Sequence, residues 1–277
     1  MHMRDGDETC AQASRRNVRH RSPRAPKMRP MHKPADLPVS TLSAQLTSPG
    51  YAFVEGEQMR PLLTSLGELT DWTDFAESWN HLGPDPYLAA KGRFRRRRHG
   101  TFSATADGPV LPEPHQAHFQ SLQYNALQGD IERWFEPIAA PIAHGDTLRT
   151  ILRFCHHLFG QTAPATRRWH IEVHQFRIEA TANAAGEPTP EGSHRDGVDY
   201  VLVLLVNRQN IASGTTTIHT PDGKLLGDFT LTHPLDAALV YDHSVYHGVT
   251  PVSPLDADQP AFRDVLVVTF KAASPSE

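Results

Sequence analysis

The sequence is poor in cysteine, with only Cys10 and Cys155 among its 277 residues. Two thiols cannot build a disulfide framework or a four-cysteine zinc site, so a reducing, cytoplasmic setting is the expectation. The chain also lacks long hydrophobic runs, since the longest covers Tyr200 to Val206 and a membrane helix needs roughly 18 residues. Because the first residues include no apolar stretch of the signal-peptide type, we expect neither secretion nor membrane insertion.

Positive charge is concentrated at the start of the chain. Residues 1–35 contain nine Lys or Arg and three Asp or Glu, although the whole chain has a formal net charge of −4. This polar segment lacks hydrophobic periodicity, so we predict a disordered basic tail and a single domain over residues 36–277. The tail has three interpretations: a nucleic-acid-binding arm, an inert solvated extension, or a start assigned too early, with Met28 or Met31 as the true start. The acidic remainder argues against a nucleic-acid groove.

Hydrophobic periodicity divides the domain into an early helical part and a late strand-rich part. Apolar residues at helical spacing predict a helix over residues 146–159. Alternation in residues 169–180, an apolar run in residues 200–206 and a turn signal at Pro221-Asp222-Gly223 predict antiparallel strands. The other predicted elements are helices over residues 61–69 and 73–79 and strands over residues 51–56, 93–104, 118–125, 238–252 and 262–272. The pattern predicts an α+β fold with a β-sandwich or open barrel as its core.

A candidate metal site begins directly before the apolar strand at Tyr200. His194 and Asp196 are two positions apart, so on an extended strand their side chains point to the same face. His247 supplies a second imidazole at the end of a later strand. Two histidines and one carboxylate on one face of a metal leave coordination positions open, as in the facial triad of non-haem Fe(II) oxygenases. We therefore predict that these three side chains bind iron.

A second His-x-Asp pair shows that this short motif is a weak signal by itself. His144 and Asp146 open the helix predicted over residues 146–159, where Asp146 is better explained as an N-cap and His144 as a surface residue. Arg263 strengthens the prediction, because it begins the strand after the distal histidine and could pair bidentately with a dicarboxylate co-substrate. A salt bridge with Asp264 or a surface acid is the alternative for Arg263.

Seventeen histidines supply several competing ligands. The competitors are His174, His219, His233 and His243. His243 and His247 are four residues apart, a spacing that suits zinc on a helix, but the surrounding residues predict strand and loop. Asp242 and Tyr241 lie near His247 in the sequence and are candidates for orienting its ring, with a turn role as the alternative for Asp242.

Several motifs of this chain occur together in one known family. They are HQFRIEA, GEPTPEGSHRDG, SGTTTI, LTHPLDAALVYDHSVYHGVTPV and FRDVLVVTF, with GRFRRRRHGTF and QSLQYN upstream. Together they resemble the bacterial 2-oxoglutarate/Fe(II)-dependent dioxygenases of the L-isoleucine hydroxylase type, which hydroxylate free L-amino acids. The resemblance spans roughly residues 50–272, and it rests on several motifs rather than one.

The resemblance implies a double-stranded β-helix (jelly roll) with flanking helices, its core mainly within residues 90–272. It implies that His194, Asp196 and His247 are the catalytic residues and iron ligands and that Arg263 holds the distal carboxylate of 2-oxoglutarate. The cofactors would be Fe(II), 2-oxoglutarate as co-substrate, and O2. The expected reaction is hydroxylation of an L-amino acid, with decarboxylation of 2-oxoglutarate to succinate and CO2.

An amino-acid substrate requires a cation for its carboxylate and an acceptor for its ammonium group. The candidates for substrate contact are Arg177, Glu191, Arg97 and Tyr124. His174 and Arg177 face opposite sides of a regular strand, so at most one of them faces the pocket. For each candidate, a surface ion pair or a structural hydrogen bond is the alternative.

Two other functions remain open from the sequence. One is a non-catalytic metal-binding jelly-roll sensor whose basic tail contacts nucleic acid. The other is a hydroxylase that acts on a modified or carrier-linked amino acid in a biosynthetic pathway. We expect a small-molecule amino acid as the partner, no membrane, no nucleic acid on the acidic domain, and a homodimer as one option for assembly.

Overall fold

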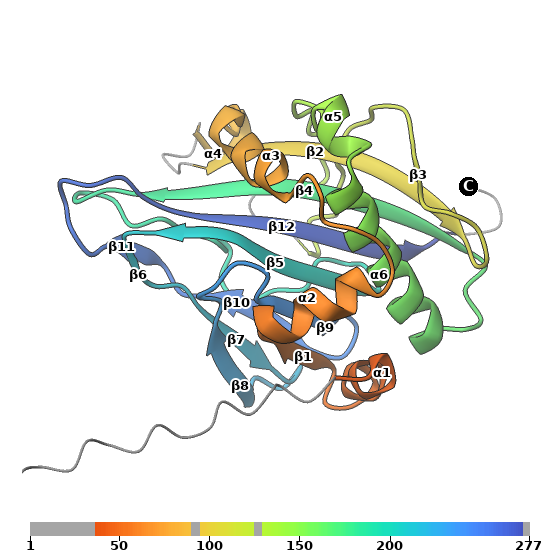
Figure 1. The fold of residues 1–277 in the computed structure, drawn as a ribbon. Helices are drawn as coiled ribbons and strands as arrows, with labels where there is room; N and C mark the ends of the chain where they lie inside the picture. Colours follow the sequence, from red (N-terminus) through yellow and green to blue (C-terminus); the bar gives the residue numbers. More distant parts are fainter. Residues whose placement is uncertain (1–36, 90–94, 125–128, 274–277) are drawn as a thin grey trace, which may run out of the picture. The chain divides into compact units, whose positions relative to one another are not determined.

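In the computed structural model, which describes residues 37–89, 95–124 and 129–273, the largest element is a seven-stranded sheet (Figure 1). Its order is β1-β9-β5-β12-β4-β2-β3, and all neighbouring strands are antiparallel. The strands are β1 (Tyr51–Val54), β2 (Arg95–Thr105), β3 (Leu111–Pro112), β4 (Arg168–Ala180), β5 (Tyr200–Gln209), β9 (Ala237–Tyr241) and β12 (Ala261–Ala272). The tail predicted for residues 1–35 lies outside the described residues.

A smaller sheet with the order β10-β7-β8 faces the large one. Its strands are β7 (Thr215–His219), β8 (Leu225–Thr230) and β10 (Tyr246–Val249), and β6 (Ile211–Ser213) pairs with β11 (Val252–Pro254). Val201 and Val240 of the large sheet pack against Ile218 and Val245, which belong to β7 and to the turn before β10. This sandwich of antiparallel strands confirms the predicted α+β class and jelly-roll core. The hairpin predicted between β7 and β8 is also confirmed.

Helices cover the other face of the large sheet (Figure 1). They are α1 (Val39–Thr47), α2 (Gly56–Thr64), α3 (Trp72–Glu77), α5 (Ala140–Ala143), α6 (Asp146–Thr162) and the 3-10 helix η1 (Ser78–His81). The remaining helix, α4 (Pro86–Ala89), precedes β2. Leu202 follows Val201 along β5 and therefore points to the opposite face, where it packs with Leu148 and Phe159 of α6. The helix predicted over residues 146–159 is thus confirmed. It is the longest of the helices described on this face of the sheet. Within the described residues, no helix has the length and apolar character required to span a membrane.

The strand predicted over residues 118–125 is wrong over residues 118–124, the part of it that the structure describes. His118 forms only an isolated bridge with Arg133, and residues 122–124 form a turn. Phe119 and Leu122 are more than half exposed. The segment therefore borders a cavity, whose lining includes residues 116–121, rather than forming a strand within a ladder.

The helix predicted over residues 61–69 begins earlier, at Gly56, and ends at Thr64. The backbone N–H of Gly56 donates to the carboxylate of Asp236 at 2.8 Å, although 180 residues separate the two. A tertiary contact therefore sets the start of this helix, and no residue near Gly56 in the sequence signals it.

Replacing Asp236 with alanine is expected to lower the free energy of unfolding by about 2 kcal/mol, because the Gly56 N–H would lose its partner in a buried position. The Asp236 carboxylate also accepts the backbone N–H groups of Thr232 and His233 at 2.8 and 2.9 Å. Urea denaturation of the wild type and of D236A measures the change. Asp236→Asn keeps one acceptor oxygen and should lose less, so equal stability of all three proteins would contradict the role of this carboxylate.

Candidate active site

One cavity of about 590 Å³ brings most of the predicted site residues together. Its lining includes His194, Asp196 and His247, together with Arg263 of β12. These residues come from separate parts of the chain and meet where the two sheets face each other. The sequence prediction that they share one site therefore agrees with the geometry.

The three donor side chains converge. Nε2 of His194 lies 3.4 Å from Oδ1 of Asp196, and Nε2 of His247 lies 3.5 Å from Oδ2 of the same carboxylate. One donor atom from each residue lies within 4.8 Å of the other two. The backbones of His194 and His247 exchange two N–H···O bonds of 2.9 Å, which align the two histidines. This spacing could hold one metal ion.

The chemistry of the donors fits Fe(II). Nδ1 of His194 lies 3.0 Å from the carbonyl oxygen of Gly192, which can only accept, so this nitrogen carries the proton and Nε2 offers a lone pair. Nδ1 of His247 is buried and has no hydrogen-bond partner among the described residues. Two imidazoles and one carboxylate are the donor set of non-haem Fe(II) sites with open positions.

The electrostatics of the two imidazoles differ. Burial disfavours the charged form of His194, but the hydrogen bond and charge of Asp196 outweigh it and raise the pKa of His194 to about 9. Burial lowers the pKa of His247 to about 4. The single Asp196 carboxylate therefore compensates one charged imidazole, and a cation between the three donors would take the place of that proton.

Asp242 holds the segment that carries Asp196. Its carboxylate accepts the backbone N–H groups of Asp196, Gly197 and Val198 at 2.9, 2.8 and 3.2 Å. Gly197 has a φ of 80°, and a Cβ on it would lie 2.4 Å from the ring of Tyr124. The sequence named Asp242 as a partner for an imidazole, whereas the structure shows it holding the backbone of the neighbouring acid.

Asp242→Asn is expected to weaken Fe(II) binding roughly 10- to 100-fold, the usual cost of losing a hydrogen-bond partner that orients a metal ligand. The amide keeps the shape of the side chain but replaces one acceptor oxygen with a donor group, which would face backbone N–H groups. Anaerobic Fe(II) titration measures the affinity. Asp228→Asn, at an exposed position of β8, is the matched control, and equal affinity of D242N and D228N would contradict the prediction.

Arg263 is a buried cation within the cavity. It is 1% exposed, and its Nε and Nη2 have no hydrogen-bond partner among the described residues. Burial lowers its pKa to about 10, so the guanidinium remains charged at neutral pH. The alternative of a salt bridge to Asp264 is wrong, because that carboxylate binds Arg177 through two contacts of 2.7 Å. A buried guanidinium with unused donors is suited to an anionic ligand.

Three of the four candidates for substrate contact line the cavity, and the fourth does not. Arg97, Tyr124 and Glu191 belong to the lining. Arg177 is held by Asp264 and Asn80 instead. The reason is the regular alternation of β4, which turns His174 toward the cavity and Arg177 toward the opposite face.

The competing histidines separate into two groups. His219 lies on β7 opposite Tyr246, His233 is exposed, and His243 pairs with Asp199 at 2.8 Å. None of these three joins the triad or lines its cavity in the described part of the chain. His174 does line the cavity, as part of a second cluster that the sequence analysis missed. This cluster consists of His99, His118, Glu172 and His174. The sequence did offer one signal for this cluster, because Glu172 and His174 are two residues apart and share one face of the predicted strand. The sequence did not show which strand pairs with it, so His99 could not be placed beside them.

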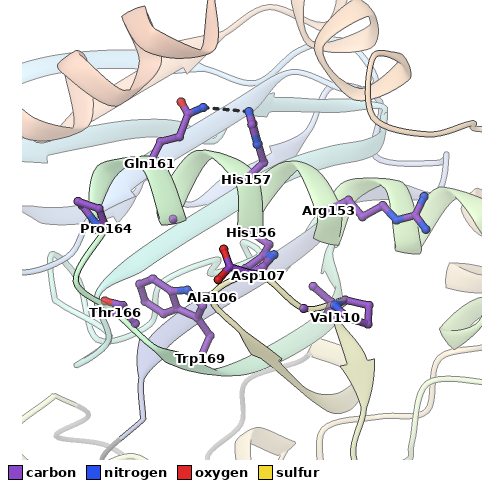
Figure 2. Close-up of a pocket in the computed structure, with 13 residues that line it drawn as sticks. Ala106, Asp107, Val110, Arg153, His156, His157, Gln161, Pro164, Thr166 and Trp169 are labelled. Atoms are coloured by element: carbon purple, nitrogen blue, oxygen red, sulfur yellow. Dashed lines mark hydrogen bonds between the residues drawn. The ribbon is translucent and has the colours of Figure 1, made fainter.

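A second pocket, of about 700 Å³, lies between α6 and the turn that follows β2 (Figure 2). His156, His157 and Gln161 of α6 contribute to its wall, and Nε2 of Gln161 donates to Nε2 of His157 at 3.1 Å. None of its described lining residues belongs to the predicted site. The triad cavity is therefore the candidate for the chemistry.

Residues 76–269 match the sequence model of the family described as 2OG-Fe dioxygenase. The match covers well over half of the chain, which therefore belongs to this family and is a 2-oxoglutarate-dependent non-haem iron dioxygenase. Family membership implies Fe(II), 2-oxoglutarate and O2 as cofactors.

Similar proteins carry more specific names. The chain is 29% identical over 185 residues to the L-isoleucine-4-hydroxylase of Bacillus thuringiensis, covering 65% of this chain and 76% of that protein. It is 25% identical over 243 residues to the 3(1)-hydroxy-L-isoleucine 4-dioxygenase of Pantoea ananatis, covering 83% and 94%. The crystal structure of a bsmA homolog from Methylobium petroleophilum PM1 has a TM-score of 0.78 and 37% identity, covering 87% of this chain and 95% of that one.

Proposed function

We propose that this dioxygenase hydroxylates a free L-amino acid with an aliphatic side chain and converts 2-oxoglutarate to succinate and CO2. In the proposed site His194, Asp196 and His247 bind Fe(II), and Arg263 binds the distal carboxylate of 2-oxoglutarate. One observation carries the proposal: three metal-binding donors share a cavity with a fully buried guanidinium that has unused N–H groups.

Each group of the chain has a defined task in this proposal. Bound Fe(II) supplies the open coordination positions and the oxidising chemistry with O2. The Gly192 carbonyl and the Asp242 carboxylate orient the triad from outside, through His194 and the backbone of Asp196. Arg263 is buried in a cavity whose lining includes several valines, and such apolar surroundings strengthen the pairing of its charge with a carboxylate.

The substrate class rests on two supports. The names of the two curated relatives specify isoleucine and a hydroxylated isoleucine as their substrates. The cavity combines charged groups with apolar walls, to which Leu88, Phe119 and Phe176 contribute. An aliphatic amino acid, which is charged at one end and apolar at the other, matches that division.

The test is an activity screen with purified protein, Fe(II), ascorbate and 2-oxoglutarate. L-isoleucine, L-leucine, L-valine and L-methionine are added one at a time, and mass spectrometry follows the gain of one oxygen atom alongside succinate. We expect product and succinate in equal amounts with at least one of these amino acids. Succinate production that no free amino acid stimulates would contradict the proposal and would favour a carrier-linked substrate.

A further inference from the structure

A cluster of three histidines and one glutamate lies at the wall of the triad cavity, and three of its four members line that cavity. His99 of β2 lies directly opposite His174 of β4, and Glu172 precedes His174 by two residues, so all three point to one face. His118 joins them from the segment that bridges to Arg133. The described part of the chain places these side chains beside Arg97, which is two residues before His99 on the same face.

Hydrogen bonding assigns the protons in this cluster. Nη2 of Arg97 lies 2.8 Å from Nδ1 of His174, and a guanidinium only donates, so Nδ1 of His174 accepts and its Nε2 carries the proton. That Nε2 faces Glu172, at 3.7 Å. Nδ1 of His118 donates to the same carboxylate at 2.9 Å, and Nε2 of His99 lies 3.3 Å from it. The imidazoles are therefore arranged around Glu172, and His174 links Arg97 to it.

Arg97 is buried and shares its nearest carboxylate, that of Asp85, with a second arginine. It is 3% exposed and packs between two rings, with its guanidinium carbon 3.5 Å from the ring centroid of Phe135 and 4.7 Å from that of Phe176. Asp85 lies 3.7 Å from its Nη1 but makes a shorter contact, 2.9 Å, with Arg95. Nε of Arg97 has no hydrogen-bond partner among the described residues.

A buried charge without full pairing is costly, and it is stabilised when a ligand supplies the missing partner. His174, the hydrogen-bonded partner of Arg97, is neutral, because burial holds the pKa of this imidazole well below its usual value. Burial also lowers the pKa of Arg97 well below its usual value, but a guanidinium has so high an intrinsic pKa that it stays protonated in proteins. Arg97 lines the cavity and retains one unused N–H group, at its buried Nε. Its aromatic neighbours and the link through His174 to Glu172 fix its orientation before a ligand binds.

We propose that Arg97 binds the α-carboxylate of the amino-acid substrate and that His174 and Glu172 position it for this contact. The inference rests on the proposed function and extends it: the enzyme requires a substrate with a free carboxylate and rejects amino acids linked to a carrier through that group. In this arrangement Arg263 binds the distal carboxylate of 2-oxoglutarate, and Arg97 binds the α-carboxylate of the amino acid.

A metal ion is the competing occupant of the cluster. One donor atom each from His99, His118, Glu172 and His174 lies within 4.8 Å of the others, and three histidines with one carboxylate can bind zinc. The Arg97 guanidinium bonded to His174 opposes this occupant, because a divalent cation would stand next to a buried positive charge.

The first test compares the preferred amino acid with its α-amide, using the wild-type enzyme. The amide keeps the side chain and the amino group but lacks the negative charge, so kcat/KM should fall roughly 100-fold or more. The calorimetric Kd for 2-oxoglutarate should stay the same. Turnover of the amide within threefold of the acid would overturn the inference alone, whereas no turnover of any free amino acid would overturn the proposed function and the inference with it.

The second test repeats this comparison in Arg97→Gln. The KM for the amino acid should rise roughly 100-fold, while the Kd for 2-oxoglutarate changes less than about threefold, and the preference for acid over amide should disappear. A purely structural role would leave that preference unchanged and would overturn the inference. Arg96→Gln is the matched control, because Arg96 is the neighbouring residue, is 45% exposed and pairs with Glu179 on the opposite face of β2.

Metal analysis shows whether the cluster of His99, His118, Glu172 and His174 binds a metal ion or positions Arg97 without one. Wild-type protein loaded separately with Fe(II) and Zn(II) and then desalted should hold one ion per chain. A second ion per chain that is lost in Glu172→Gln would overturn the assignment of this cluster to the positioning of Arg97.

Discussion

Replacing His194 with alanine is expected to abolish both iron retention and 2-oxoglutarate turnover. The proposed site has three ligands, and His194 contributes one nitrogen that the Gly192 carbonyl orients. Outer hydrogen-bond partners of a ligand are worth roughly 10- to 100-fold in metal affinity, so the loss of a ligand itself should exceed that range. Metal analysis after loading and succinate production measure the two effects.

The chain provides a matched control in its other His-x-Asp pair. His144 is exposed and precedes α6, while Gly145 is the N-cap and Asp146 the first residue of that helix. His144→Ala should therefore retain iron and full activity. If H194A retained as much iron as H144A, the metal site would have to lie elsewhere in the molecule.

Replacing Arg263 with alanine is expected to raise the KM for 2-oxoglutarate by at least roughly 100-fold. Two charge-assisted hydrogen bonds, each worth about 1.5–3 kcal/mol, would be lost in the proposed complex. Iron binding should be preserved, since Arg263 is not one of the three converging donors. Initial rates at increasing 2-oxoglutarate concentration, measured alongside iron content, test both parts.

Arg263→Lys provides the graded comparison for this prediction. Lysine keeps the charge but lacks the planar fork, so its KM should lie between those of the wild type and R263A. Thermal unfolding of each variant separates a loss of binding from a loss of fold. An unchanged KM in folded R263A would place the 2-oxoglutarate carboxylate on another cation of the cavity, and Arg97 would then be the first to examine.

Much of the site followed from local periodicity. The spacing of His194 and Asp196, and the strand that follows them, indicated that the two side chains share a face. The helical pattern after His144 indicated that the other His-x-Asp pair, His144 and Asp146, opens a helix and does not belong to the metal site. Alternation on β4 also predicted that His174 and Arg177 could not both face the pocket, and the structure places only His174 there.

Hydrophobic periodicity does not predict contacts between residues that are far apart in the sequence. The start of α2 depends on Asp236, and the second cluster depends on the register that sets His99 opposite His174. The segment from His118 onward has a strand-like sequence, yet it borders the cavity without entering the sheet.

From the order of its residues alone, this protein could be assigned most of its long strands, its main helix and a sandwich or barrel of strands, because side-chain alternation is a local property. The jelly-roll class came from the resemblance of several motifs to one family, and the three donors proposed for the metal site came from their spacing and ligand chemistry. The pairing of strands is not local, since it depends on which apolar faces bury each other across the whole chain. That pairing places Asp264 on Arg177 and so leaves Nε and Nη2 of Arg263 without a hydrogen-bond partner in the described part of the chain. The pairing of β2 with β4 also brings Arg97 to His174. In our proposal, this contact positions Arg97 to bind the carboxylate of the amino-acid substrate.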